Sequence, residues 1–416
     1  MALPPKEEGS GLIDKQFSLV GVLNTETREI GVISGDFSAP RAAILVQEGI
    51  RTLGYACLDG TNEVVERAIA ATEGADVQRA WDRCNGRQLK ASVVLCTLGS
   101  TALLRSAVEA LLAQDHENFE LIIVDNDPTS GNVSKQLAAI SDPRLHIVAE
   151  SRRGLSFARN TGVSVSTGEV IAFTDDDALT DNHWLSALLS VFEADSEARV
   201  GAVTGPAFPA ELLYPSQRFF EARGGFPKVT SPIVWSLSES NASIAGFGEP
   251  GEGGPLYPFA TARVGAGVSM AFRRSVLEEI GEFDTALGAG TPTNGGEDLD
   301  AFARVLHAGF AIITNPDAIV HHVHRRDLSG LEKQSFGNGT GMAALLCKTV
   351  VHRPQSIVQL AGRIPAVARR VAPGSQRMVG SDADVPPSLT KAEITGFVIG
   401  PWRYLRAVAR QWRSWR

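Results

Sequence analysis

The stretch Val170-Ile171-Ala172-Phe173-Thr174-Asp175-Asp176-Asp177 is an apolar run that ends directly in three aspartates. A short, continuous apolar run is typical of a strand buried on both faces, as in a parallel sheet. One aspartate would suffice to cap a following helix, which is the structural alternative. Three adjacent carboxylates instead favour a hard divalent cation, Mn²⁺ or Mg²⁺, which takes oxygen ligands and commonly bridges to a diphosphate.

Similar apolar runs precede this stretch, and segments with helical spacing separate them. The predicted strands are Ala91–Cys96, Leu121–Val124 and Leu145–Val148, and the predicted helices are Thr101–Gln114, Ser134–Ile140 and Gly154–Val163. Strands that alternate with helices predict βαβ units and an α/β fold with a mostly parallel central sheet. Ligands of such sheets bind at the carboxyl ends of the strands, where Asp125 and residues 175–177 fall.

Polar side chains beside these strand ends are candidates for nucleotide binding. Thr97 follows the first strand, and Asp125 follows the second, where it can accept a hydrogen bond from a base N–H. Arg152, Arg153 and Arg159 lie between the strand ends and can balance phosphate charge. A lone arginine is usually a solvated surface residue, but this cluster beside carboxylates favours a phosphate-binding role.

A second group of candidates is Gly295-Gly296-Glu297-Asp298, at the predicted start of a helix. The simpler interpretation is that the two acids complement the dipole at the helix N-terminus. The catalytic interpretation is that a carboxylate here acts as a general base and takes the proton from an attacking hydroxyl group. The two glycines would let a bulky acceptor approach.

Three of the eight histidines cluster in Val320-His321-His322-Val323-His324 after a short predicted strand, Ala318–Val320. A lone histidine is usually an ordinary hydrogen-bonded polar residue, but a cluster near a predicted metal site is a candidate ligand set. Adjacent residues of a strand point to opposite faces, so only one of His321 and His322 would face the metal.

Five segments, in this order along the chain, resemble a known family: Val93–Thr97, Ile122–Asn126, Gly154–Asn160, Phe173–Asp177 and Gly296–Asp298. They are similar to motifs of the family 2 glycosyltransferases of the GT-A fold, in particular bacterial members, over residues 91–326. The resemblance implies a GT-A nucleotide-diphospho-sugar transferase fold. It also implies an inverting, single-displacement transfer of a sugar from a UDP-, dTDP- or GDP-sugar to an acceptor hydroxyl group.

The resemblance also implies roles for individual residues. Residues 175–177 look like the DxD motif that holds the metal and the sugar-nucleotide, with Asp175 and Asp177 on the metal and Asp175 and Asp176 on the donor. Thr97, Asp125, Arg153 and Arg159 complete the donor site, and Asp125 looks like the residue that contacts the base. Asp298, with Glu297 beside it, looks like the catalytic base, and His322 or His324 looks like a late metal ligand. The departure is Leu98-Gly99-Ser100, where relatives often carry a polar or basic residue.

Two other classes of function stay open. A sugar nucleotidyltransferase is also an α/β, metal-dependent protein, but it needs a glycine-rich loop with Arg or Lys after the first strand, which Leu98–Leu104 does not offer. The other is a non-catalytic nucleotide- or carbohydrate-binding protein, and the intact acidic groups at 175–177 and 297–298 argue against it.

The length of 416 residues predicts more than one structural unit. We expect an N-terminal accessory unit (1–88) that contains strands, the catalytic domain (89–330), a helical extension (331–370), a linker (371–390) and a basic amphipathic helix (391–416). The long segment Pro206–Pro258 is rich in Gly and Pro and is expected to be an irregular functional loop. The four cysteines are far apart and predict no disulfide framework or zinc site.

The basic C-terminal region suggests where the protein works. The net charge is −8, but residues 361–416 carry ten Lys or Arg and three acids. Arginines recur on one side of the last helix and Trp402, Leu405 and Trp412 on another, which is typical of a helix lying on an anionic membrane surface. The alternative is docking onto the acidic body. Nucleic acid is not expected as a partner.

No signal-like N-terminus and no apolar run of about 18 residues is present. We therefore expect a cytoplasmic protein, peripheral on the inner face of the plasma membrane. Its acceptor would be a saccharide or a lipid-linked molecule used in cell-surface glycan assembly, such as cell wall polysaccharide.

Overall fold

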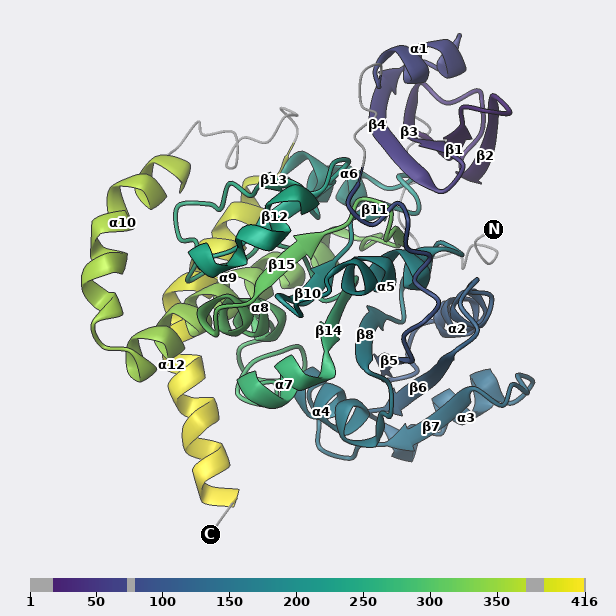
Figure 1. The fold of residues 1–416 in the computed structure, drawn as a ribbon. Coiled ribbons are helices and arrows are strands. Elements are labelled where there is room, and N and C mark those ends of the chain that lie inside the picture. Colours follow the sequence, from purple (N-terminus) through teal and green to yellow (C-terminus); the bar gives the residue numbers. More distant parts are fainter. Residues whose placement is uncertain (1–17, 73–78, 372–384, 415–416) are drawn as a thin grey trace.

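The structure is a computed structural model that describes residues 18–72, 79–371 and 385–414. A small N-terminal unit lies against one side of a larger α/β body, and long C-terminal helices cover another side (Figure 1). The N-terminal unit consists of β1 (Leu19–Asn24), β2 (Glu29–Ser34), β3 (Arg41–Glu48), β4 (Arg51–Asp59) and α1 (Val64–Ala70). Its sheet has the order β2-β1-β3-β4, so the strands predicted in this unit are confirmed.

A buried ion pair joins the N-terminal unit to the body. Asp317, in the body, pairs with Arg79 at 2.6 Å and accepts a hydrogen bond from the backbone N–H of Thr52 at 2.7 Å. Beside it, Tyr55 packs against Phe208, with ring centroids 5.0 Å apart. Because the charges are buried and paired, this contact fixes one orientation of the unit on the body.

The central sheet has nine strands within the described residues, in the order β13-β12-β15-β10-β14-β8-β5-β6-β7. Its strands are β5 (Ala91–Thr97), β6 (Phe119–Asp125), β7 (Leu145–Ala149), β8 (Val170–Asp175), β10 (Val200–Thr204), β12 (Ile233–Trp235), β13 (Glu249–Pro250), β14 (Met270–Arg273) and β15 (Ala311–Thr314). The part β8-β5-β6-β7 is parallel, as predicted. Five of the eight strand pairs are parallel, as the prediction of a mostly parallel sheet requires, whereas β14 runs antiparallel to β8 and β10, and β12 antiparallel to β15. The sheet is mixed.

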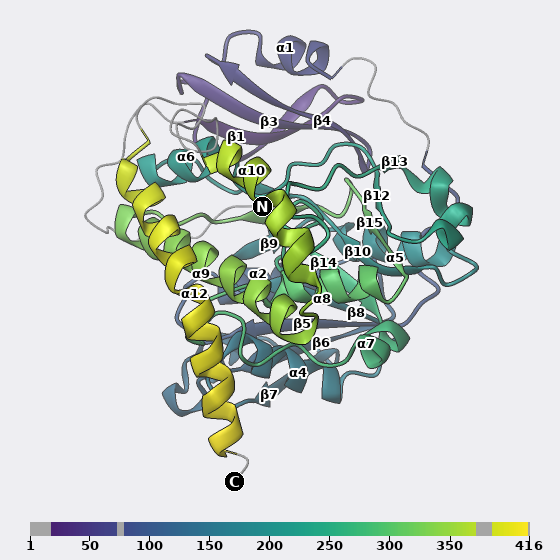
Figure 2. The same ribbon diagram turned by 90° about the vertical axis from the view of Figure 1, so that its left-hand side faces the viewer.

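Helices cover both faces of this sheet (Figures 1 and 2). They are α2 (Leu104–Leu112), α3 (Asn132–Leu137), α4 (Leu155–Val165), α5 (Trp184–Ala194), α7 (Arg274–Ile280) and α8 (Glu297–His307). Val93 and Leu95 of β5 belong to the apolar cluster that includes α2 and α5, whereas Val94 belongs to the cluster that includes α4, α7 and α8. The continuous apolar run of β5 is therefore buried on both faces, as its sequence predicts.

A small third sheet brings the histidine cluster beside the acidic triplet. Its strands are β9 (Ala178–Thr180), β11 (Ala207–Pro209) and β16 (Val320–His322), in the order β11-β16-β9. His322 pairs in register with Ala178, the residue after Asp177. The strand ends at His322, two residues beyond the predicted end. The segment 206–258 is also more regular than predicted, since it holds β11, α6 (Pro215–Ala222), β12, the 3₁₀ helix Glu239–Phe247 and β13.

The C-terminal region forms α9 (Leu328–His352), α10 (Ser356–Val371) and α12 (Pro387–Ser414). The last helix begins at Pro387, before the predicted start at residue 391, and most of the predicted linker, 372–384, lies outside the described residues. α12 packs along α9 through small residues (Figure 2). A Cβ atom on Gly339 would lie 2.0 Å from the carbonyl oxygen of Glu393, and one on Gly400 would lie 2.6 Å from that of Thr340.

Gly339→Leu is therefore expected to separate α12 from α9. An added side chain at this contact with the backbone of α12 forces a shift that typically costs about 1–3 kcal/mol in a packed core. Thermal unfolding and limited proteolysis of the α12 region measure the effect. The control is Gly362→Leu on α10, where an added Cβ meets nothing within 4 Å. Equal stability of the two variants would contradict the close packing.

Candidate active site

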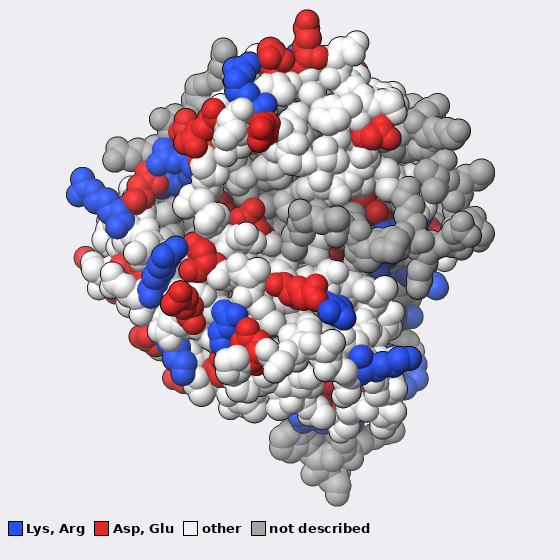
Figure 3. All heavy atoms as spheres, turned by 90° about the vertical axis from the view of Figure 1, so that its right-hand side faces the viewer, with Lys and Arg blue, Asp and Glu red and all other residues white. Residues whose placement is uncertain are grey.

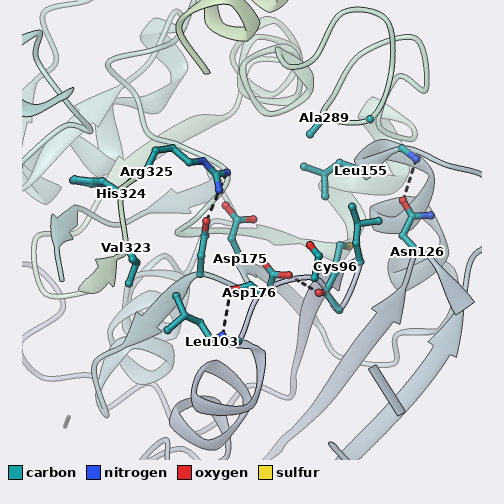
Figure 4. Close-up of a pocket in the computed structure, with 18 of the residues that line it drawn as sticks. Cys96, Leu103, Asn126, Leu155, Asp175, Asp176, Ala289, Val323, His324 and Arg325 are labelled. Atoms are coloured by element: carbon teal, nitrogen blue, oxygen red, sulfur yellow. Dashed lines mark hydrogen bonds and ion pairs between the residues drawn. The ribbon is translucent and has the colours of Figure 1, made fainter. Parts of the chain in front are cut away.

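The carboxyl ends of β5, β6 and β8 open into a cleft of about 600 Å³, within the usual range of ligand pockets. The residues that line it are 96–98, 100–103, Asn126, the turn at 153–155, the acidic triplet 175–177, Ala289-Gly290 and 323–327. Figure 4 shows Asp175 and Asp176 between Arg325 on one side and Asn126 on the other. The sheet thus brings together the residues that the sequence places at strand ends.

Each carboxylate of the acidic triplet has a different partner. Asp176 accepts a hydrogen bond from the hydroxyl group of Thr97 at the end of β5. Asp177 lies 3.3 Å from Nε2 of His322 and 3.9 Å from the guanidinium group of Arg325. The backbone N–H of Val323 donates to the carbonyl oxygen of Asp177, which holds the 323–327 segment against the triplet.

Burial and mutual repulsion raise the pKa of two of the three carboxylates in the triplet. Burial raises the pKa of Asp175, and the charges of Asp177 and Asp298 add to the effect. Burial and the charge of Asp177 raise the pKa of Asp176 to about 7. Burial acts in the same direction on Asp177, but the charge of His322 and its hydrogen bond outweigh it, so the pKa of Asp177 is lowered. A bound cation would relieve this repulsion.

The candidate donor residues after β6 do not all face the cleft. Asp125 is buried, accepts from the backbone N–H of Asp127 at 3.0 Å and is not among the residues that line the cleft. Its neighbour Asn126 does line the cleft, and its side-chain oxygen accepts from the N–H of Gly154 at 3.0 Å, which fixes the turn before α4. Arg153 lines the cleft with a side chain that is 56% exposed, so it can reach a phosphate group.

Arg159 lies elsewhere, in the interior beneath the triplet. Its side chain is 3% exposed, and it pairs with Glu297 at 2.9 Å and lies 3.9 Å from Asp175. Burial raises the pKa of Glu297 to about 7, the charge of Asp298 adds to this, and Arg159 opposes it. Arg159 is not among the residues that line the cleft. The Arg159–Glu297 pair therefore supports the site from the interior and does not contact a ligand in the cleft.

Asp298 is more accessible than Glu297 and sits at the start of α8. One of its carboxylate oxygens accepts from the N–H of Gly267 and the other from the N–H of Leu299, both at 2.8 Å. The loop before it is held by α9: Thr340 donates to the carbonyl oxygen of Thr293, and a Cβ on Gly296 would lie 2.7 Å from the carbonyl oxygen of Gly341. The glycines of α9 thus allow the close contact that positions Asp298.

The side chains of the three late histidines point in different directions, and those of His321 and His322 do so as the alternation of side chains along a strand predicts. His321 faces away from the triplet, and burial lowers its pKa to about 4. His322 faces Asp177. His324 points away from the carboxylates (Figure 4), and its Nε2 lies 2.8 Å from Oε1 of Glu221 on α6.

A metal site at Asp177 and His322 fits the geometry. Ligands of one Mg²⁺ or Mn²⁺ ion at about 2.1 Å, at right angles, lie about 3.0 Å apart, and the two side chains are 3.3 Å apart. No group of three or more His, Cys, Asp or Glu side chains in the described part of the chain is arranged as a self-contained metal site. Such an ion would therefore complete its coordination with water molecules or, when the substrate is bound, with phosphate oxygens, as is usual for Mg²⁺.

Sequence reasoning missed three residues of this site. Asn126 follows the candidate Asp125 directly, and it holds the turn that carries Arg153. Arg325 follows the histidine cluster directly, so its position was a usable signal. Glu221 lies in the segment rich in Gly and Pro, and no sequence pattern connects it to His324.

Comparison with known proteins supports the class that this fold and site suggest. Residues 92–281 match the model of "Glycosyl transferase family 2". The glucosyl-dolichyl phosphate glucuronosyltransferase of Haloferax volcanii is 29% identical over 260 residues, which cover 60% of this chain and 75% of that protein. The succinoglycan biosynthesis protein ExoM of Rhizobium meliloti is 26% identical over 268 residues, which cover 62% of this chain and 76% of that protein.

Among solved structures, a mannosyltransferase of Pyrobaculum calidifontis in complex with GDP-Man and Mn²⁺ aligns with a TM-score of 0.44 and 21% identity, over 80% of this chain and 76% of that one. The protein has an α/β fold with a mixed central sheet. It is a glycosyltransferase whose residues 92–281 match family 2.

Proposed function

We propose that the protein is an inverting glycosyltransferase that uses a divalent metal ion and a nucleotide-sugar. The observation that carries the proposal is the cleft, in which three aspartates and two exposed arginines converge at the carboxyl ends of the strands, with His322 3.3 Å from Asp177. When bound, a Mn²⁺ or Mg²⁺ ion supplies charge neutralisation for the departing diphosphate. Asp177 and His322 would hold it, with Asp175 beside them.

The chain's own residues have distinct parts in this proposal. Thr97, Asp175 and Asp176 position the nucleotide and sugar, Asp125 acts from behind the cleft by holding the turn at Asp127, and Arg153 and Arg325 face the diphosphate. Asp298 takes the proton of the acceptor hydroxyl group as it attacks the anomeric carbon. Glu297 and Arg159 hold the floor of the site in place. In a single displacement the new bond has the opposite anomeric configuration.

The stereochemistry can be tested without knowing the acceptor, because water can replace it in slow hydrolysis. The full chain is incubated with Mn²⁺ and an α-linked nucleotide-sugar, and proton NMR follows the first sugar released before mutarotation. The proposal predicts the β anomer first. Early release of the α anomer would show retention and overturn the inverting mechanism.

We further propose that the acceptor lies at an anionic membrane surface, on the cytoplasmic side. Within the described residues no helix has the length and apolarity that crossing a bilayer requires. However, α10 and α12, which run along the side of the molecule turned to the viewer in Figure 2, expose large apolar side chains: Ile357, Val358, Ile364, Ile394, Val398, Trp402 and Leu405. Val358 is 74% and Val398 72% exposed. An exposed apolar surface of this kind commonly marks a membrane or protein contact.

The charges on this face fit anionic lipid. Over the described residues from 353 to 414, Glu393 is the single acid, and it is paired with Arg223. Lys391, Arg406 and Arg410 are exposed along α12. On the opposite face, acidic and basic side chains are interspersed (Figure 3). The relative from Haloferax volcanii is named for a glucosyl-dolichyl phosphate, which is a lipid-linked saccharide.

The side of the last helix that docks onto the body is not the side of Trp402 and Leu405. Tyr404 and Ala407 face the body together with the glycines, and Trp402 and Leu405 face outward. The helix thus docks onto the body, and the apolar side chains that remain exposed on it support the proposed membrane contact. The side chains of Trp412, Arg413, Trp415 and Arg416 lie outside the described part of the structure.

Val398→Asp is expected to lower binding to phosphatidylglycerol vesicles about tenfold, because a charge would enter the apolar interface. Co-sedimentation of the full chain measures it, with phosphatidylcholine vesicles for comparison. Phe37→Asp is the control, since Phe37 is equally apolar and 54% exposed but lies on the N-terminal unit. Wild-type protein that stays in the supernatant with both lipids would overturn the membrane proposal and leave the reaction proposal untouched.

A further inference from the structure

A buried chain of hydrogen bonds runs from α6 to the acidic triplet. Oε1 of Glu221 lies 2.8 Å from Nε2 of His324, and Nδ1 of His324 lies 2.9 Å from Nδ1 of His322. Nε2 of His322 then lies 3.3 Å from Oδ1 of Asp177. The two histidines are buried, and the side chain of Glu221 is 17% exposed.

The number of protons in this chain of hydrogen bonds fixes the tautomer of the His324 and His322 rings. The carboxylate of Glu221 is an acceptor only, so Nε2 of His324 must carry a proton and donate it. A neutral His324 then has a lone pair on Nδ1. Only one proton fits between the two Nδ1 atoms, and it must come from His322. With its proton on Nδ1, His322 could offer the lone pair of Nε2, the atom that faces Asp177, to a metal ion that replaces the N–H hydrogen bond between Nε2 and Asp177.

Packing holds both rings in this arrangement. The ring of Phe220 lies 4.7 Å from that of His324, and the ring of Phe226 lies 5.0 Å from that of His322, measured between centroids. Lys228 pairs with the second oxygen of Glu221 and keeps that carboxylate charged and oriented. The segment between α6 and β12 therefore surrounds this chain of hydrogen bonds, the Glu221–His324–His322 relay, on its outer side.

We propose that Glu221 is a positioning residue that acts through His324 to make His322, and not His324, the histidine that binds the metal ion. This inference rests on the proposed metal-dependent function and deepens it. Without Glu221, His324 is free to protonate on Nδ1, and His322 then turns its N–H toward Asp177. Supporting residues that orient a histidine ligand typically contribute about 10–100-fold to metal affinity.

The test is a titration of the full chain with Mn²⁺ alone, with electron paramagnetic resonance reporting the free ion. Glu221→Leu is expected to weaken binding about tenfold or more. Glu221→Gln is expected to keep most of the affinity, because the amide oxygen accepts the same hydrogen bond. The control is Asp195→Asn, which loses a buried carboxylate paired with Arg273 and so destabilises the fold without touching the relay.

The outcomes separate the two proposals. If wild-type protein binds no Mn²⁺, the metal-dependent function fails. If wild type binds Mn²⁺ and Glu221→Leu binds it equally well, only the relay is wrong. Should Glu221→Leu not fold, ¹⁵N-histidine NMR of wild type with Mg²⁺ decides: the relay requires the Nδ1–H tautomer for His322 and the Nε2–H tautomer for His324, and the reverse pattern overturns it.

Discussion

Replacing Asp298 with asparagine is expected to lower kcat by about 10²–10⁴-fold and to leave the affinity for the donor unchanged. The amide cannot accept a proton from the attacking hydroxyl group, and the side chain contacts the N–H groups of Gly267 and Leu299 rather than the residues that line the cleft. Rates of sugar release and calorimetric titration of the nucleoside diphosphate with Mn²⁺ measure the two quantities separately.

Asp300→Asn is the matched control on the same helix. Asp300 is buried and pairs with Arg304 and Lys348, so its replacement costs stability while the chemistry at the start of α8 is unaffected. Per mole of folded protein, this variant should keep its turnover. An Asp298→Asn variant as active as Asp300→Asn would exclude Asp298 as the base.

Replacing Arg159 with methionine is expected to destabilise the fold by about 3–5 kcal/mol at pH 8, because Glu297 loses its partner while buried. The effect should shrink at lower pH. The pKa of Glu297 is raised from 4.5 to about 7, so its contribution favours folding below pH 4.5 and is lost as pH rises through 7. Without Arg159 that pKa rises further, and the difference between the two proteins grows with pH.

Denaturant unfolding at pH 5.5 and pH 8 measures this difference. Arg105→Met is the control, since Arg105 forms an exposed pair with Glu109 that is worth at most about 0.5 kcal/mol. A loss of stability in Arg159→Met that is the same at both pH values would show that packing, and not the unpaired carboxylate, is responsible.

The parallel half of the sheet and the acidic triplet could be predicted because local pattern determines them. β5, β6 and β8 are short apolar runs buried on both faces, and a run that ends in aspartates places them at the sheet edge whatever the rest of the chain does. The direction of β14 could not be predicted in the same way. Met270–Arg273 is too short for its sequence to distinguish a parallel from an antiparallel partner.

The arginines and the last helix show a second limit of prediction from the sequence alone. Arg153 and Arg159 have the same chemistry, but the former lines the cleft and the latter is buried against Glu297, far away in the sequence. The pattern of α12 indicated an apolar face, yet its glycines dock onto α9 and part of the apolar stripe stays outside. In both cases the deciding partner comes from another part of the chain, so local spacing carries no information about it.

The most direct test of the account is a thermal-shift panel of UDP, GDP, dTDP and CMP, each with and without Mn²⁺, on wild type and Asp177→Ala. A ligand that binds only the folded state stabilises it by about 2.7 kcal/mol at one hundred times its dissociation constant. The account predicts that one nucleotide raises the Tm of wild type only when Mn²⁺ is present, and does not raise that of Asp177→Ala. Equal shifts in the two proteins, or no shift with any nucleotide, would contradict a metal-dependent donor site at the acidic triplet.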